Sequence, residues 1–207
     1  MITIDEDAKT LVTAPSAPRR CRRRRIRYDE SLALRIELEP WEPVESHHLI
    51  GVGLFTAVVL ALLLGGDPGW TPILDSANLA FHEAGHMFYG VLGDTAGLYG
   101  GVLGQLTFPL VVMIVFFFRR EPSSVVVGAV WFAQNLFNIA RYMADARAQE
   151  LPLVGGGEHD FEHIFTRWHA LHRDLAIASN TRTIAWLIIV AALAWLGWRY
   201  RQSRSAR

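Results

Sequence analysis

The chain has 207 residues, 51% of them hydrophobic, and its 20 basic residues balance 20 acidic ones. This apolar content, with a mean hydropathy of +0.21, indicates a membrane protein. The single cysteine, Cys21, excludes an intramolecular disulfide and a zinc site built from cysteines.

Residues 1–46 form the first predicted region, a basic segment that precedes any apolar stretch. Residues 1–28 mix Pro, Ser, Ala and Arg without periodicity, which predicts disorder because such a segment buries too little apolar surface. Residues 34–38 alternate apolar and charged side chains until Pro40 ends the pattern. This short amphipathic stretch is expected to form an edge strand or to lie on the membrane surface.

Four apolar stretches approach or reach the roughly 17 to 25 residues that a membrane helix needs. They are residues 49–66, 98–118, 123–140 and 183–198, and residues 72–92 make a fifth, more polar segment. The sequence therefore predicts an all-α, polytopic membrane protein with four or five membrane helices. Its predicted regions are the N-terminal segment 1–46, a membrane domain 47–142, a polar Gly/His-rich segment 143–182, and a last membrane helix with a basic tail, 183–207.

Arginines flank the first and last membrane segments. They are Arg19, Arg20, Arg22, Arg23, Arg24, Arg25 and Arg27 on one side and Arg199, Arg201, Arg204 and Arg207 on the other. The positive-inside bias places both groups in the cytoplasm, which an even number of spans satisfies. We therefore expect residues 72–92 to enter and leave by one face or to lie buried against the other helices, and we expect an integral protein of the bacterial cytoplasmic membrane. The basic run adjoins a membrane segment and lacks interleaved aromatics, which favours a lipid partner over nucleic acid.

The main chemical motif is His82-Glu83-Ala84-Gly85-His86 in the fifth segment, which we expect to be a membrane-embedded helix. In a helix the spacing of four places both imidazoles on one face, where they can bind one metal ion. Two neutral imidazoles and a third protein ligand suit Zn²⁺ and leave its fourth position for water, with Glu83 as the general base. The alternative is a polar core in which these side chains satisfy one another.

The polar Gly/His-rich segment is the natural source of the third ligand. His159 and Asp160 follow a triple glycine, whose flexibility lets the chain turn back towards the motif. Asp145, at the end of the fourth apolar stretch, ranks behind them. The remaining histidines, His163, His169 and His172, are expected to line one side of an amphipathic helix.

Three amides, Gln134, Asn135 and Asn138, lie on adjoining parts of one helical face in residues 123–140. They are candidates for hydrogen bonds between helices. They are equally candidates, with Asp145, for a second shell that orients metal ligands or substrate.

Glycines at 97, 100, 101 and 104 open the next apolar stretch. Small residues four apart allow membrane helices to pack closely. The alternative is an irregular glycine-rich stretch whose free backbone holds an extended substrate.

With this motif inside an apolar segment, the sequence resembles the intramembrane zinc metalloproteases of the site-2 protease type, over about residues 72–160. The resemblance implies His82 and His86 as zinc ligands and Glu83 as the base. Residues 151–160 loosely resemble the family's second motif, in which Leu-Asp-Gly supplies the third ligand. Here no Leu-Asp-Gly is present, and the nearest acid is Asp160.

We therefore expect a membrane zinc metallopeptidase that hydrolyses peptide bonds in a membrane-protein or peptide substrate. One alternative is a membrane di-iron oxidase of the desaturase or hydroxylase kind, because His82/His86, His159/His163 and His169/His172 form three closely spaced pairs. The other is a non-catalytic metal-binding scaffold. The sequence does not indicate an oligomeric state.

Overall fold

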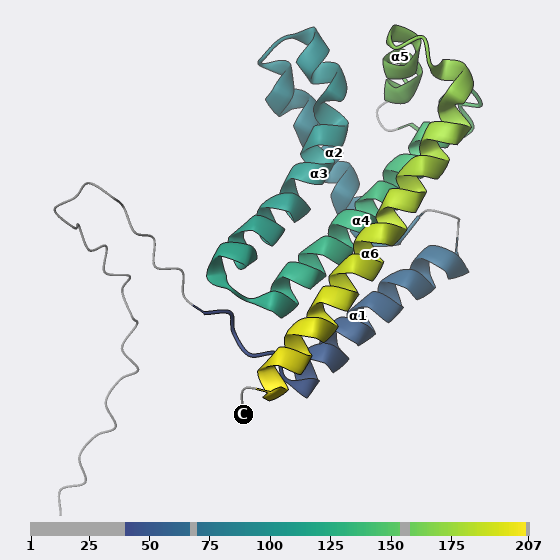
Figure 1. Cartoon of the computed structure of the whole chain (residues 1–207). Coiled ribbons are helices and arrows are strands. Elements are labelled where there is room, and N and C mark those ends of the chain that lie inside the picture. Colours follow the sequence, from purple (N-terminus) through teal and green to yellow (C-terminus); the bar gives the residue numbers. More distant parts are fainter. Residues whose placement is uncertain (1–39, 67–69, 154–157, 206–207) are drawn as a thin grey trace, which may run out of the picture. The chain divides into compact units, whose positions relative to one another are not determined.

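The computed structural model describes residues 40–66, 70–153 and 158–205, and every regular element among them is helical. The elements are α1 (Ser46–Gly65), α2 (Leu74–Gly90), α3 (Asp94–Arg119), α4 (Pro122–Ala144), α5 (Asp160–Arg167), the short 3-10 helix η2 (Leu171–Arg173) and α6 (Asp174–Ser205) (Figure 1). The all-α prediction is confirmed. The disorder expected over residues 1–28, the amphipathic stretch at 34–38 and the flexible glycines at 155–157 lie outside the described residues.

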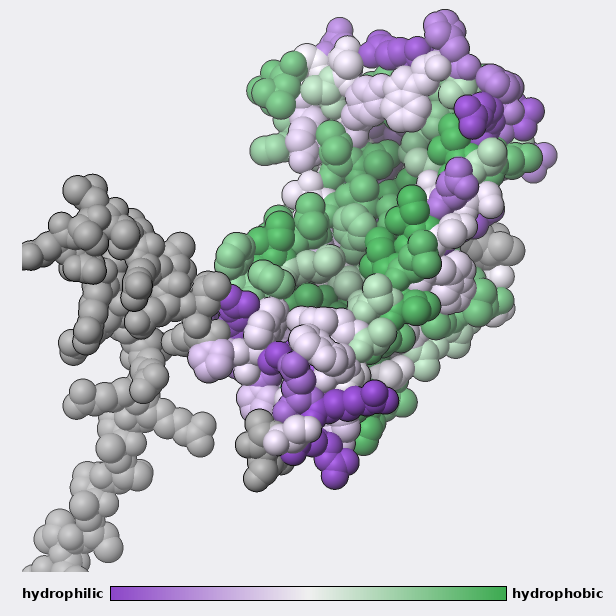
Figure 2. All heavy atoms as spheres, viewed as in Figure 1, coloured by the Kyte–Doolittle hydropathy of each residue, from purple (hydrophilic) through white to green (hydrophobic). Residues whose placement is uncertain are grey.

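Four helical segments in the described residues are long and apolar enough to cross a membrane: α1, α3, α4 and the segment Leu171–Ser205. They match the four predicted apolar stretches, except that α1 ends at Gly65, one residue before the first stretch does. Large apolar side chains are exposed along α1, α3 and α6, as expected of a surface that faces lipid. Figure 2 shows this surface as a hydrophobic middle between polar ends. The protein is therefore a polytopic helical membrane protein.

Helix α4 is central, since α1, α3 and α6 all pack against it. Its buried positions include Gly128, Ala129, Ala133 and Ala140, and small residues of this kind let neighbouring helices approach closely. Two apolar clusters fill the contacts. One contains Val52, Val59, Val126, Val130 and Leu196, and the other contains Leu63, Ala133, Phe137, Ala185 and Ile189.

Trp41 joins three chain segments at one end of the helices. Its ring centroid lies 5.2 Å from that of Phe117 in α3 and 5.2 Å from that of Trp195 in α6. The guanidinium groups of Arg120 and Arg199 lie 4.9 and 5.5 Å from the Trp41 ring. Aromatic and basic side chains of this kind are typical of a membrane boundary. We call this end, which contains the start of α1, the α3–α4 junction and the end of α6, the basic end.

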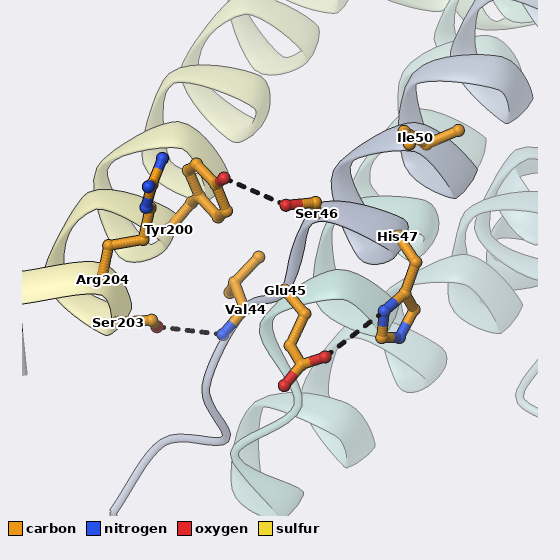
Figure 3. A pocket seen from close by; sticks show the side chains of 8 residues that line it. All are labelled: Val44, Glu45, Ser46, His47, Ile50, Tyr200, Ser203 and Arg204. Atoms are coloured by element: carbon orange, nitrogen blue, oxygen red, sulfur yellow. Dashed lines mark hydrogen bonds and ion pairs between the residues drawn. The ribbon is translucent and has the colours of Figure 1, made fainter. Parts of the chain in front are cut away.

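Polar contacts also fasten the start of α1 to the end of α6 around a surface pocket (Figure 3). The Val44 amide donates to the Ser203 hydroxyl at 2.9 Å, and the hydroxyls of Ser46 and Tyr200 are 3.1 Å apart. The start of α1 and the end of α6 therefore lie at the same end of the helices.

The segment before α2 turns back against α4. Trp70 lies beside Arg141, near the end of α4, with 5.8 Å between the guanidinium carbon and the ring centroid. Leu74 packs against the apolar cluster that contains Val130, earlier in α4. Between them Ile73 has φ 71°, a rare conformation for a β-branched residue, and Leu74 donates to the Pro72 carbonyl at 2.9 Å. Helix α2 thus begins against α4, with Thr71 and Asp75 buried and Ile73 exposed; that it enters and leaves by one membrane face stays a prediction.

A buried polar network holds this turn. Asp75 accepts hydrogen bonds from the Thr71 amide, from Asn78 at 3.1 Å and from Gln134 at 2.7 Å. Trp131 donates to the Asn78 side-chain oxygen at 3.1 Å. Leaving one such group without its partner costs on the order of 1–3 kcal/mol, so the network fixes the start of α2 against α4.

Glycines allow α2 and α3 to touch along their backbones. A Cβ on Gly85 would collide with the Gly100 carbonyl, and one on Gly100 would lie 2.6 Å from the Gly85 carbonyl oxygen. Residues 94–119 form one continuous helix. The glycines at 97–104 therefore allow the two helices to pack closely, as one interpretation predicted. The alternative prediction, an irregular stretch that holds substrate, was wrong.

Candidate metal centre

Three side-chain atoms from α2 and α5 converge at one point. The Nε2 atoms of His82 and His86 are 3.1 Å apart and lie 2.9 and 3.2 Å from Oδ2 of Asp160. A tetrahedral zinc ion with bonds of about 2.0–2.1 Å holds its ligands about 3.3–3.4 Å apart. The three atoms thus form a triangle only slightly smaller than the one that zinc requires. In the described residues this is the one group of three such side chains.

A hydrogen bond at the Nδ1 atom of His86 fixes the orientation and the tautomer of the ring. His86 Nδ1 lies 2.8 Å from the Gly97 carbonyl oxygen, which can only accept a hydrogen bond. Nδ1 therefore carries the proton, and Nε2 of the neutral ring keeps its lone pair for a metal. Hydrogen bonds of this type orient metal-binding histidines and set their tautomer.

Gly101 of α3 leaves the space beside these nitrogens. A Cβ at this position would collide with His82 Nε2 and would lie 2.5 Å from His86 Nε2. The glycine therefore keeps helix α3 close to both imidazoles without filling the place where an ion would bind.

We expect Gly101→Ala to lower zinc affinity by about 10-fold or more, since the methyl group displaces both ligand rings. Competition with a chromogenic chelator, on detergent-purified protein, measures this change. Gly90→Ala is the matched control on the same helix pair, because its Cβ would meet nothing nearer than 3.9 Å. Equal zinc affinity in the two variants would contradict the role of Gly101.

Asp160 is held by its place in the chain and by Tyr142 of α4. It is the first residue of α5, and its amide donates to the Tyr142 hydroxyl at 3.0 Å. The Tyr142 ring also lies edge-on to His82, with 6.1 Å between ring centroids. Among the described residues no group accepts the Tyr142 hydroxyl proton, so this proton is available to a group in the cavity beside it.

His159, the other favoured third ligand, lies outside the cluster. Its side chain is fully buried, with Nδ1 accepting from the Glu162 amide at 3.3 Å and Nε2 lying 3.4 Å from Oδ2 of Asp145. Burial lowers the pKa of the His159 imidazole, which keeps the ring neutral and able to accept this bond. His159 thus caps the start of α5. Its side chain points away from the cluster, whereas the side chain of the next residue, Asp160, points into it.

Asp145 is likewise occupied elsewhere. Its carboxylate accepts from the amides of Glu150 at 2.9 Å and Leu151 at 3.1 Å, which shapes the loop after α4. The structure therefore places Asp160 with the two motif histidines and leaves both His159 and Asp145 in supporting positions.

The cluster opens into a cavity of about 660 Å³. Glu83 lines it together with His82, His86 and Asp160, and further lining residues include Asn138, Arg141 and Tyr142. The Glu83 carboxylate makes no hydrogen bond or ion pair with any other residue that the structure describes. The carboxylate is therefore free to act on a molecule in the cavity.

The three predicted amides divide between two roles. Asn138 lines the cavity and accepts from Gln105 of α3 at 3.0 Å. Gln134 does not line the cavity but donates to Asp75, which does. Asn135 donates to the Trp131 carbonyl at 3.1 Å within α4. Most of these contacts join helices, as one interpretation predicted, and only Asn138 lies beside the site.

Sequence reasoning missed Tyr142 and Asn78. Tyr142 follows Gln134 and Asn138 at further intervals of four, so extending the polar face of α4 by one turn would have found it. Asn78 precedes His82 by four residues in the same way. Both are recognisable only as continuations of a polar stripe.

The remaining histidines do not join the cluster. His163 lines the cavity, but its Nε2 is paired with Glu158 at 2.7 Å, and neither His169 nor His172 belongs to a three-residue group in the described part of the chain. The described residues therefore contain no second group of three ligands of the kind that the di-iron alternative needs. The prediction that His163, His169 and His172 line one side of a single helix is also wrong, because α5 ends at Arg167.

Two imidazoles and one carboxylate suit zinc, and the same set can hold Fe(II). The converging Nε2 atoms of His82 and His86, a carboxylate at coordinating distance and the space left by Gly101 all fit a single ion. Comparisons with protein-family models, curated proteins and solved structures found no match to this chain.

Proposed function

We propose that the protein is a membrane-embedded zinc metallopeptidase, a divergent relative of the site-2 protease type, that hydrolyses a peptide bond with Glu83 as general base. The observation that carries this proposal is the convergence of His82, His86 and Asp160 beside an unpaired Glu83 in one cavity. The apolar helices and the arginine-rich termini of the sequence favour a bacterial cytoplasmic membrane as its location and membrane lipid as its surroundings.

Zinc held by these three residues would polarise the substrate carbonyl and lower the pKa of a water molecule. Glu83 accepts the proton of the attacking water and then delivers it to the leaving amine. The Tyr142 hydroxyl, which already accepts from the Asp160 amide, has its own proton to donate to the carbonyl oxygen as negative charge develops there.

The position of Glu83 favours hydrolysis over the alternatives. An oxidase of the His-rich type has no need of a carboxylate base next to its ligands, whereas a hydrolase does. A scaffold needs no open cavity beside its metal.

Metal analysis of the detergent-purified full chain tests the proposal first. One zinc per chain, together with chelator-sensitive cleavage of an unstructured protein such as casein, is the expected result. Two irons per chain would favour oxidation, and no bound metal would favour the scaffold.

A further prediction concerns Tyr142→Phe, which removes the oxygen that accepts from the Asp160 amide. We expect zinc affinity to fall by about 10-fold, because a supporting partner of a ligand is lost. We also expect kcat to fall beyond what the lost zinc explains, since the O–H donor is gone. Tyr89→Phe is the control, because Tyr89 bonds Thr107 at 3.1 Å and does not line the cavity. Zinc affinity and kcat unchanged in Tyr142→Phe would reject both roles.

A further inference from the structure

The two ends of the helices differ in the basic residues that the sequence assigns to them. The basic end carries Arg119, Arg120, Arg199, Arg201 and Arg204, and the seven arginines of residues 19–27 precede it in the sequence. Trp41 contacts the end of α3 and the end of α6 there. In the sequence no apolar stretch separates these seven arginines from Trp41 and the start of α1.

The metal cavity lies at the other end. Helix α4 starts at Pro122, next to the basic end, and its first cavity-lining residue is Asn138. At a rise of 1.5 Å per residue these positions are about 24 Å apart along the helix, close to the roughly 30 Å thickness of a bilayer's hydrocarbon core. The cavity is thus near the membrane boundary farthest from the basic end.

The cavity also opens in that direction. Two of its lining residues, Glu158 and His163, have side chains that are 84% and 42% exposed, and they lie just before and within α5. Figure 1 shows α5 at the end of the helices opposite the C-terminus. Water and substrate therefore reach the cluster from the α5 end.

Among the described residues this second end carries as many basic residues as the basic end, five each; its five are Arg141, Arg147, Arg167, Arg173 and Arg182. The difference lies in the sequence outside the described residues, where nine of the remaining ten Lys and Arg residues precede α1 and Arg207 follows α6. No apolar stretch separates these ten from the helix ends at the basic end, so a count along the chain assigns them to that side. Arg147 is bound by both oxygens of Asp174, at 2.7 and 2.8 Å. The positive-inside bias counts basic residues near membrane segments and places the end with more of them in the cytoplasm.

We propose that the metal cavity opens on the non-cytoplasmic side of the membrane and takes polypeptide segments presented from that side. The substrate class rests on the proposed peptidase function, whereas the sidedness of the cavity does not. A protein whose cleavable segment lies at the outer membrane boundary fits this site, and one exposed only in the cytoplasm does not.

Cysteine labelling in membrane vesicles of both orientations tests the sidedness. In the full chain with Cys21→Ser, single cysteines replace Glu158 at the cavity mouth, Thr166 in α5 and Gln202 at the basic end, all exposed positions. A membrane-impermeant maleimide should label Glu158→Cys and Thr166→Cys in right-side-out vesicles, and Gln202→Cys in inside-out vesicles. Labelling of Glu158→Cys and Thr166→Cys from the same side as Gln202→Cys, or in the reverse pattern, would overturn the proposal.

A second measurement uses zinc and separates this inference from the peptidase. An impermeant chelator, EDTA, should remove zinc from the wild-type protein in right-side-out vesicles at least 10-fold faster than in inside-out vesicles. Faster removal from the cytoplasmic side would overturn the inference. Casein cleavage does not enter either measurement, so absence of hydrolysis would reject the peptidase and leave the labelling result to decide the sidedness.

Discussion

Replacing Glu83 with Gln should leave one zinc per chain and lower hydrolysis by a factor of about 10²–10⁴, the usual contribution of a general base. The amide keeps the size of the side chain but cannot accept the proton of the attacking water. Neither imidazole nor Asp160 is altered, so the triangle of donor atoms at 2.9–3.2 Å should remain. The experiment pairs metal analysis with cleavage rates on the same purified sample.

Glu162→Gln is the matched control for this variant. It removes one negative charge from α5, but Glu162 does not line the cavity and instead accepts from Thr166 at 3.2 Å. Its hydrolysis rate should stay within a few-fold of wild type. Full activity in Glu83→Gln would reject the mechanism, while loss of zinc from that variant would show that Glu83 supports the ligands instead.

The helices were predictable because lipid simplifies the problem. Every backbone N–H and C=O group in a bilayer must form a hydrogen bond within the protein, so a long apolar stretch that crosses the bilayer is expected to be helical. The four predicted stretches accordingly became α1, α3, α4 and α6. Their ends were less predictable, because α6 begins at Asp174 although the apolar stretch begins near residue 183. The first turns of α6 are polar and extend beyond the apolar part.

The motif histidines were predictable from their spacing, whereas the third ligand was not. His82 and His86 share a helix, so helical geometry alone brings them together. Asp160 follows them by more than seventy residues, and nothing local distinguishes it from His159. The choice depends on where α5 starts: His159 becomes the cap and Asp160 the first helical residue, so their side chains point to different surroundings.

Gly101 and Tyr142 show the same limit. The sequence indicated that the glycines after residue 96 allow close packing, but not that one of them faces the imidazoles. That position depends on the register of α2 against α3, which is set by contacts such as Gly85 on Gly100. Likewise the hydrogen bond from the Asp160 amide to Tyr142 joins two elements whose relative placement only the folded chain determines.

The third ligand is best tested by making one chemical change at two carboxylates. Asp160→Asn and Asp145→Asn each replace a buried carboxylate with an amide of the same shape. Asp160 supplies Oδ2 to the cluster, so its variant should lose zinc affinity by at least about 100-fold, more than the 10- to 100-fold typical of a supporting residue. Asp145 accepts from the Glu150 amide through Oδ1 and from the Leu151 amide through Oδ2, so Asn keeps one of these hydrogen bonds and loses the other. Because Asp145 supplies no atom to the cluster, its variant should loosen the loop after α4 but keep zinc.

His159→Asn completes this comparison, because Asn is among the residues that best cap a helix start. It removes the imidazole while preserving the hydrogen bond that begins α5. If Asp160 is the ligand, His159→Asn retains zinc and Asp160→Asn loses it, as measured by chelator competition on purified protein. The opposite order would assign the third ligand to His159 and would require the start of α5 to rotate in the metal-bound protein. Equal loss in Asp145→Asn would show instead that the loop after α4, not the Asp160 carboxylate itself, governs zinc binding.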